Sequence, residues 1–249
     1  MALPDPAALE AAGLRCWPGV ESEWDGRWVR RAANGYTQRA NSVQCLDPAD
    51  DADAPARIAA AADWFRARNI RPTFRVTPLA GPSTIAALDE AGWAEIDHSH
   101  VFAMELGSIA ADPRGHLHDL LDPAFLAAQQ QLRSYDDSKL ARLRAVLEQI
   151  DIPARGVVVR DSDGAAVASG IFDVADGIVY AGNIITDAAR RRQGFGVALM
   201  RSGLAWAQSA GASVAALNVA ADNPNGQALY RSLGYERRYD YHYRYAVTP

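Results

Sequence analysis

A short basic segment, Arg190 to Gly196, carries residue types that can bind a pyrophosphate. It reads Arg-Arg-Arg-Gln-Gly-Phe-Gly and lies between an apolar run, residues 178–185, and an amphipathic run, residues 197–210. Unpaired N–H groups at a helix start attract an anion, glycine lets the main chain approach it, and arginines add charge-assisted donors. The alternative interpretation is a capped helix start with a solvated basic face.

The composition makes this basic segment stand out. The chain has 249 residues, a formal net charge of −5 and 49% hydrophobic residues, which is typical of a globular protein. An acidic chain argues against a general nucleic-acid binder. We therefore expect a small anion at the basic segment and no nucleic-acid partner.

Other features predict the compartment and exclude some site types. The two cysteines, Cys16 and Cys45, lack CxxC spacing, so we predict neither a disulfide framework nor a zinc site. The N-terminal segment lacks a signal-peptide pattern, and no apolar run reaches the roughly 18 residues that span a bilayer. We expect a cytoplasmic protein without a membrane partner. No pattern points to one oligomeric state.

Both helices and strands are predicted around the basic segment. The spacing of Leu140, Leu143 and Leu147 predicts one long helix over residues 123–150. His116 and His118 have no further ligand cluster nearby, so we expect them in a solvated linker before this helix rather than in a metal site. The downstream pattern predicts strands at 155–160, 165–174, 178–186 and 213–219, and helices at 194–210 and 224–233.

An internal repeat predicts two copies of one α+β unit. A shift of 142 residues aligns 33–93 with 175–235 without a gap, so that the hairpin-turn dipeptides Asn34-Gly35 and Asp176-Gly177 fall together. The first copy is predicted to have helices at 55–68 and 83–91 around a strand at 72–77. Opposite the basic segment it has carboxylates in residues 48–54, which repel phosphate. We expect only the second copy to bind the anion.

A second motif follows the basic segment by about 35 residues. Asn223 and Pro224 are good residues for a helix start, which places Tyr230 about two turns into the helix. The two segments together resemble motifs of the GNAT superfamily of N-acetyltransferases. The matching residues are Arg191, Gly194 and Gly196 in the first motif, and Asn223, Tyr230, Gly234 and Tyr235 in the second.

The resemblance implies a fold and an activity. The fold would be α+β, with two tandem GNAT folds, each a mixed, mostly antiparallel sheet flanked by helices. Residues 1–106 would form a degenerate GNAT-like domain and residues 107–249 the catalytic domain. The activity would be acetyl-CoA-dependent transfer of an acetyl group to a primary amine of a small-molecule or peptide acceptor, by direct transfer and without a metal.

The resemblance also implies roles for individual residues. Backbone groups of Ile184, Ile185 and Thr186 would pair with the pantetheine arm, and Asn223 would help to position the cosubstrate near its thioester. Tyr230 would be the general acid, since a tyrosine hydroxyl is protonated at neutral pH; the alternative is a core aromatic. The turn that would hold the pyrophosphate consists of Arg191, Arg192, Gln193, Gly194, Phe195, Gly196 and Val197.

The general base is left unassigned. Several GNAT enzymes carry a glutamate on the fourth strand, where this chain has Tyr180. Asp173, Asp187 or a water relay are the possible substitutes. The missing carboxylate motivates a second hypothesis, a non-catalytic acyl-CoA-binding sensor or scaffold. A nicotinamide dinucleotide fold is excluded because the turn lacks GxGxxG and the strands do not alternate with helices.

Two further groups of residues have open roles. The alternating aromatic run from Tyr239 to Tyr245 predicts a half-buried strand, either packed against the other copy or forming a wall of the acceptor pocket. A polar and aromatic stretch of the first copy could line an acceptor cleft between the copies or stabilise their interface. Its members are Trp24, Trp28, Asn34, Thr37, Arg39, Asn41 and Ser42.

Overall fold

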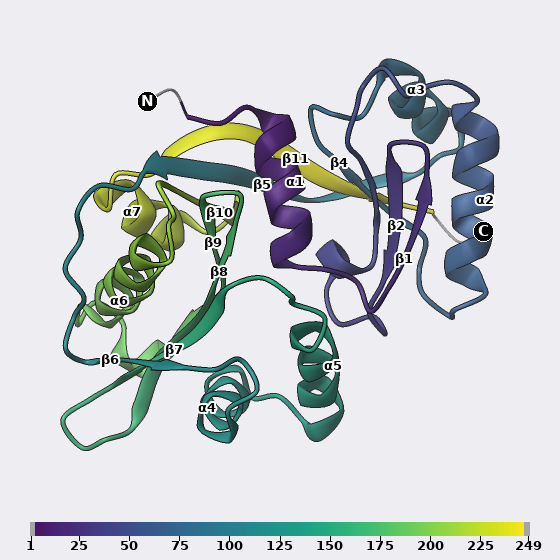
Figure 1. The fold of residues 1–249 in the computed structure, drawn as a ribbon. Coiled ribbons are helices and arrows are strands. Elements are labelled where there is room, and N and C mark those ends of the chain that lie inside the picture. Colours follow the sequence, from purple (N-terminus) through teal and green to yellow (C-terminus); the bar gives the residue numbers. More distant parts are fainter. Residues whose placement is uncertain (1–2, 247–249) are drawn as a thin grey trace.

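Eleven strands and seven α-helices lie within residues 3–246, which are the residues that the computed structural model describes (Figure 1). The strands are β1 (Glu21–Asp25), β2 (Trp28–Ala32), β3 (Val43–Cys45), β4 (Thr73–Val76), β5 (Ala94–Glu105), β6 (Gly115–His118), β7 (Ala154–Arg160), β8 (Ala166–Ala175), β9 (Ile178–Thr186), β10 (Val214–Ala220) and β11 (Glu236–Tyr245). The α-helices are α1 (Pro6–Cys16), α2 (Ala54–Arg66), α3 (Pro82–Glu90), α4 (Pro123–Arg133), α5 (Asp137–Leu147), α6 (Phe195–Ser209) and α7 (Pro224–Ser232).

A single sheet joins the two halves of the chain. Its strand order is β1-β2-β3-β4-β11-β5-β10-β9-β8-β7-β6, and only the β3–β4 and β9–β10 pairs are parallel. The predicted α+β class with a mixed, mostly antiparallel sheet is confirmed. The sheet is shared between the halves because β5, from the first half, pairs with β10, while β11, from the second half, pairs with β4. In Figure 1, β5 and β11 cross the molecule side by side between the halves.

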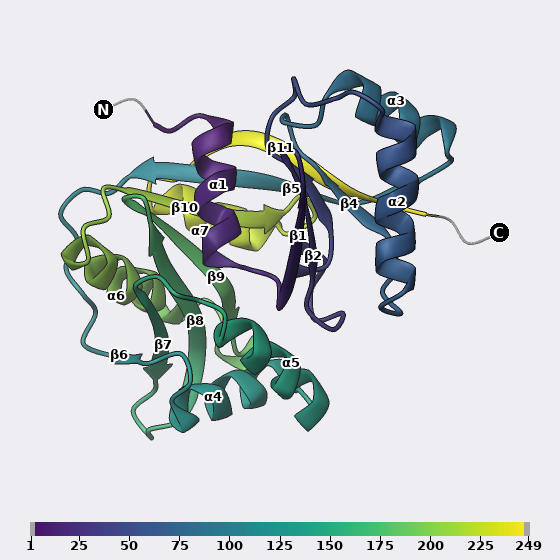
Figure 2. The ribbon, with the colours of Figure 1, turned by 45° about the vertical axis from the view of Figure 1, so that its right-hand side comes forward.

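Helices cover both faces of the sheet in the second half. Val157 and Val159 of β7 belong to a core that includes α6, whereas Val158 belongs to one that includes α4 and α5. Successive side chains of a strand point to opposite faces, so α6 and α4 lie on opposite sides of the sheet, as Figure 2 also shows. Helix α1 packs on β8 and β9 of the second half although it belongs to the first half in sequence.

Most elements of the second half agree with the sequence prediction to within two or three residues, but two predictions are wrong. The helix predicted over 123–150 is interrupted: Ser134 adopts a left-handed conformation (φ 52°) that ends α4, and Asp136 caps α5. The predicted linker around His116 and His118 is instead the edge strand β6, which pairs with β7. Backbone pairing to a distant strand, rather than local hydrophobicity, orders this segment.

The internal repeat holds for the later elements and fails for one strand. At an offset of 142 residues, α3 and α7 coincide in both bounds, and β5 and β11 begin at equivalent positions. The ungapped alignment is wrong at β3: Phe74 pairs with Val43, whereas the equivalent Ala216 pairs with Tyr180, which is five residues from the aligned position. A ten-residue loop between β2 and β3 replaces the tight β8–β9 turn and causes this shift.

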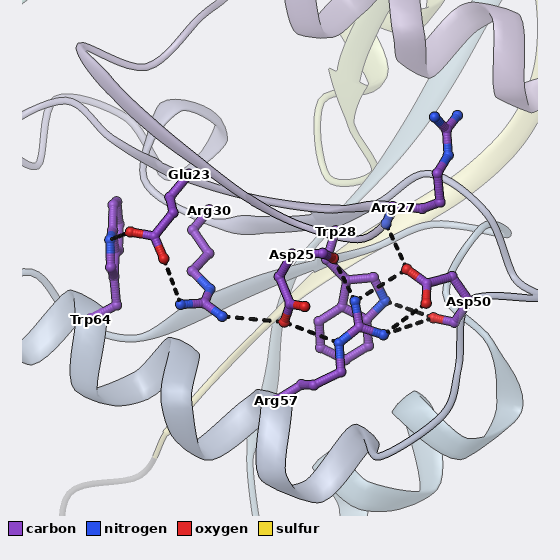
Figure 3. A network of polar contacts seen from close by, with 8 residues as sticks. All are labelled: Glu23, Asp25, Arg27, Trp28, Arg30, Asp50, Arg57 and Trp64. Atoms are coloured by element: carbon purple, nitrogen blue, oxygen red, sulfur yellow. Dashed lines mark hydrogen bonds and ion pairs between the residues drawn. The ribbon is translucent and has the colours of Figure 1, made fainter.

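Carboxylates form internal contacts at the start of α2, where the first half has its acidic segment (Figure 3). The Asp50 carboxylate accepts hydrogen bonds from Arg57 (3.0 Å) and from the Arg27 N–H (2.6 Å), and the Arg57 contact lowers the pKa of Asp50. Asp51 accepts hydrogen bonds from the N–H groups of Ser83 and Thr84 at the start of α3. These side chains stabilise the first half through ion pairs and a helix cap.

Across residues 3–246, no helix combines the length and apolar character needed to cross a membrane.

Candidate active site

Strands β9 and β10 separate at the centre of the sheet. They pair in parallel only over residues 178–181 and 214–217. Beyond Ala181, β9 stays paired with β8, so its other edge has no partner strand over residues 182–186. A cleft of about 250 Å³ opens here. Its lining residues are Arg39, Arg133, Ala181, Gly182, Asn183, Ile184, Asn218, Val219, Ala220, Asn223, Tyr230, Tyr241 and Tyr243.

A bulge in β9 accompanies this separation. Asn183 has a positive φ of 52°, and the register with β8 shifts between Ser169 and Ile171. Two side chains of α4 hold the bulge: Gln129 accepts a hydrogen bond from Asn183 (2.9 Å), and Arg133 donates one to the Ile184 carbonyl (3.1 Å). The Ile184 carbonyl therefore already has one partner, and a ligand would meet the open edge through the remaining backbone groups of residues 182–186.

The predicted anion-binding turn lies at the start of α6. Gly194, the N-cap residue, has φ 80° and Arg192 has φ 62°. Within the described structure, the N–H groups of residues 191–197 donate no hydrogen bond to a protein acceptor; the first bond of the helix comes from the Ala198 N–H to the Gly194 carbonyl. Successive free N–H groups at a helix start form an anion-binding concavity. The geometry of this turn is therefore suited to a phosphate.

Arginine side chains around this turn differ in their contacts. Arg190 pairs with Asp161 at 3.1 Å, so it is not a free donor. Arg191 and Arg192 are exposed and have no ion pair among the described residues. Arg114, which the sequence did not single out, lies over the Phe195 ring with its guanidinium 5.4 Å from the ring centre, and it is paired with Asp112 at 2.9 Å.

Gly196 allows the start of α6 to pack closely against α7 and β9. A Cβ added there would lie 3.2 Å from Leu229 of α7 and 3.5 Å from the Thr186 hydroxyl oxygen of β9. The turn and the open edge of β9 are thus adjacent. An extended ligand could lie along the edge with its anionic end at the turn.

Tyr230 borders the cleft from helix α7. Its side chain is 8% exposed, and burial raises its pKa to about 12. The hydroxyl therefore stays protonated throughout the neutral range and can act as a proton donor. The sequence left a core aromatic as the alternative; Tyr230 does pack in the core, but it also lines the cleft.

Asn223 has a structural role that the sequence predicted. Its side-chain oxygen accepts a hydrogen bond from the Gly226 N–H at 3.0 Å and caps α7. Capping fixes the start of the helix that carries Tyr230. Asn223 also lines the cleft.

Neither Tyr180, which stands at the position of the family glutamate, nor the two possible substitutes, Asp173 and Asp187, line the cleft. The Tyr180 hydroxyl donates to the Leu9 carbonyl of α1 at 2.9 Å and lies beside a small buried cavity instead. Asp173 is 2% exposed, and burial raises its pKa well above the usual range. Asp187 caps a short 3-10 helix at residues 188–190. Among the residues that line the cleft there is no carboxylate.

Several lining residues were not predicted as part of the site. Arg133 lies on a helix whose sequence gave only an amphipathic pattern, and Asn218 lies on β10. Of the residues with open roles, Arg39, Tyr241 and Tyr243 line the cleft, whereas Trp28 is in the core of the first half and Asn41 holds its own loop through bonds from the Ala33 and Gly35 N–H groups.

Comparison with known proteins agrees with this architecture. Residues 5–246 match the family described as probable histone acetyltransferase Rv0428c, C-terminal. An uncharacterized N-acetyltransferase, YobR of Bacillus subtilis, is 21% identical over 250 residues, which cover 97% of this chain and 99% of that protein.

Two solved structures share the fold. A GCN5-related N-acetyltransferase from Kribbella flavida superposes with a TM-score of 0.74 at 19% identity, covering 100% of this chain and 98% of that one. A tandem GNAT protein from the clavulanic acid biosynthesis pathway has a TM-score of 0.65 at 14% identity, covering 84% and 76%. The chain thus belongs to the family of the probable histone acetyltransferase Rv0428c C-terminal region, within the GNAT superfamily of N-acetyltransferases.

Proposed function

We propose that the protein is an acetyl-CoA-dependent N-acetyltransferase that moves the acetyl group directly to a primary amine. The observation that carries this proposal is the cleft between β9 and β10, with the buried Tyr230 hydroxyl beside it and the free N–H groups of residues 191–197 at the end of the open strand edge. This arrangement fits a ligand with an extended arm and a pyrophosphate.

Three groups of residues would bind different parts of acetyl-CoA. The open edge at Ile184, Ile185 and Thr186 would pair with the pantetheine arm. The turn would bind the pyrophosphate through backbone N–H groups and through Arg191 and Arg192; its other members are Gln193, Gly194, Phe195, Gly196 and Val197. Asn223 would position the thioester end indirectly, because it fixes the start of α7.

The proposed reaction is one nucleophilic substitution. The amine nitrogen bonds to the acetyl carbonyl carbon, the carbon–sulfur bond breaks, and the departing thiolate takes a proton from the Tyr230 hydroxyl. The amine loses its proton to solvent through water, and solvent reprotonates Tyr230. General acid catalysis of this kind contributes roughly 10²- to 10⁴-fold to the rate.

We also propose a division of labour between the halves. Residues 1–106 form a degenerate GNAT-like unit and residues 107–249 the catalytic one, with the strands β5 and β11 exchanged between them. The likeness to a tandem GNAT structure supports this division. Both cysteines are free and buried, which supports a reducing compartment such as the cytoplasm.

A turnover assay tests the proposed reaction. Thiol release from acetyl-CoA is measured across a panel of amines with the wild type and Tyr230→Phe, and we expect the variant to lose about 10²- to 10⁴-fold in kcat. Tyr235→Phe is the matched control, because the buried Tyr235 hydroxyl has no hydrogen-bond partner among residues 3–246 and lies next to Tyr230 but outside the cleft. Undiminished turnover by Tyr230→Phe would remove Tyr230 from the acid role.

A second candidate function is a non-catalytic acyl-CoA sensor or scaffold. The lack of a carboxylate among the cleft-lining residues favours it. Calorimetry that detects tight acetyl-CoA binding, together with no thiol release on any amine, would support this alternative over the enzyme.

A further inference from the structure

Two guanidinium groups line the cleft. Arg39 comes from the first half and Arg133 from α4, and no carboxylate lines the same cleft. A side chain that lines an open cleft keeps its charge available to a ligand unless a protein group already neutralises it. The contacts of the two arginines therefore decide what the cleft can bind.

The Arg133 guanidinium is already hydrogen-bonded within the protein, whereas the Arg39 guanidinium is available to a ligand. Arg133 donates to the Ile184 carbonyl and to Gln129. Arg39 lies with its guanidinium 4.9 Å from the centre of the Trp17 ring, and the Trp17 indole N–H is in turn held by Thr37 at 3.0 Å. Throughout residues 3–246 the guanidinium of Arg39 has neither a hydrogen-bond acceptor nor an ion-pair partner. The aromatic stack orients a cation whose donors remain free.

The charges behind Arg39 do not neutralise it. A water-sized cavity next to the cleft is lined by Arg39, Arg31, Arg75 and Glu10. The Glu10 carboxylate forms an ion pair with Arg75 at 2.7 Å. Burial lowers the pKa of Arg31 to about 9, so Arg31 remains a cation at neutral pH. Burial favours the neutral form of the nearby Asp173. The region thus has an excess of positive charge.

This charge is too far along the strand to serve the pyrophosphate. A Cβ added at Gly182 would lie 3.6 Å from the Arg39 Nη2 atom, so Arg39 is at the start of the open edge. Four residues separate Gly182 from Thr186, where the edge reaches the start of α6. Fully extended, they would span at most about 13 Å at 3.3 Å per residue, and the bulge at Asn183 shortens this span. An anion at Arg39 must therefore belong to another ligand.

Resting on the proposed function, we infer that the acceptor is an amine that bears a carboxylate, and that Arg39 of the first half binds this carboxylate. Guanidinium and carboxylate form strong, charge-assisted hydrogen bonds. No carboxylate among the cleft-lining residues would repel this group. The first half thereby supplies the specificity residue and the second half the chemistry.

Matched pairs of amines test the inference. Thiol release is measured with L-alanine, L-phenylalanine and L-glutamate, with their carboxamides, and with a lysine peptide blocked at both ends. We expect Arg39→Gln to lower kcat/KM for the amino acids by about tenfold to a hundredfold and for the carboxamides by less than about threefold. An amino acid and its carboxamide differ in amine pKa. This difference cancels when kcat/KM for one substrate is compared between the wild type and the variant.

Two further variants serve as controls. Arg39→Lys keeps the charge and should retain most of the preference for the amino acids, while Arg66→Gln removes an exposed arginine that pairs with Asp63 on α2 and should change nothing. Acetyl-CoA affinity, measured by calorimetry, should be the same in Arg39→Gln and the wild type, which also shows that the variant is folded.

The outcomes separate this inference from the proposed function. Equal use of amino acids and carboxamides, preferred use of the blocked lysine peptide, or an equal loss on both members of a pair in Arg39→Gln would overturn the carboxylate inference and leave the acetyltransferase intact. No turnover with any amine, despite acetyl-CoA binding, would overturn the proposed function and this inference with it.

Discussion

Burial decides the chemistry of individual side chains in this protein. Tyr230 and Tyr180 are both buried tyrosines whose pKa values burial raises, yet their surroundings differ. Tyr230 borders the cleft, whereas the Tyr180 hydroxyl donates its hydrogen bond to the Leu9 carbonyl. Of the two, only Tyr230 is placed to exchange a proton with a ligand in the cleft.

The pH dependence of turnover should reflect the raised pKa of Tyr230. The acid form is the active form, and it is lost only as the pH rises through the pKa of about 12. We therefore expect no loss of kcat attributable to Tyr230 between pH 7 and about 10, the pH at which an ordinary tyrosine would be about half ionised. Thiol release measured over this range tests the expectation. A descending limb below pH 9 that disappears in Tyr230→Phe would contradict it.

At the scale of elements, the position of helix α6 determines where an anion can bind. Its start lies next to the open edge of β9 because Gly196 permits close contact with α7 and β9. Its middle lies on β8 because Gly203 faces the buried ring of Phe172. Two predictions follow from these contacts, one for binding and one for stability.

Arg191→Gln should weaken acetyl-CoA binding. An exposed charge near a ligand anion contributes up to about 1 kcal/mol, so the dissociation constant should rise by up to about fivefold, and less at high salt because ions screen exposed charges. Isothermal calorimetry at low and high salt measures both effects. Arg66→Gln, on a helix away from the turn, is the control. An unchanged affinity at low salt would show that the guanidinium does not contact the ligand.

Gly203→Ala should destabilise the fold. The added methyl would lie 2.3 Å from the Phe172 ring, and overpacking of a core typically costs about 1–3 kcal/mol, which outweighs the gain of about 1 kcal/mol in helix propensity. Urea unfolding measures the change in the free energy of unfolding. Gly107→Ala, with open space around the added methyl, should stay within about 0.5 kcal/mol. Equal stability of the two variants would mean that α6 can move away from β8.

At the scale of the whole molecule, the halves are joined by exchanged strands and by helix α1. Strand β5 pairs with β10, and β11 pairs with β4. The buried Glu10 of α1 accepts hydrogen bonds from Arg75 of β4 (2.7 Å), from Gln44 of β3 (2.7 Å) and from Tyr239 of β11 (2.7 Å). We expect the two halves to unfold together.

Glu10→Gln should test this junction. Removing one partner of a buried ion pair leaves the other charge uncompensated and typically costs about 3–5 kcal/mol. Urea unfolding should show a single transition in both proteins, at a lower urea concentration for the variant. Arg15→Gln on the same helix is the matched control, because its pair with Asp176 is about half exposed and should contribute less than about 1 kcal/mol. Two separate transitions would show that the halves are independent.

Local patterns account for what could be predicted. The apolar run of β9, the hairpin-turn dipeptide Asp176-Gly177 with its left-handed φ values of 52° and 76°, and the Asn223 cap each depend on neighbours in sequence. They were predicted correctly because a few adjacent residues determine their geometry. The break at Ser134 was missed because the apolar spacing continues through it, and the β3 shift was missed because an ungapped comparison hides a loop of different length.

The sequence by itself determined the α+β class, the membership of the GNAT superfamily, and the basic turn and tyrosine helix of its two motifs, because short-range residue patterns encode turns, caps and amphipathic faces. Tertiary structure alone decided that β5 and β11 are exchanged, that Tyr180 faces α1, and that Arg39 meets the second half at the cleft. These features depend on backbone pairing and burial between segments more than a hundred residues apart, which no local pattern records.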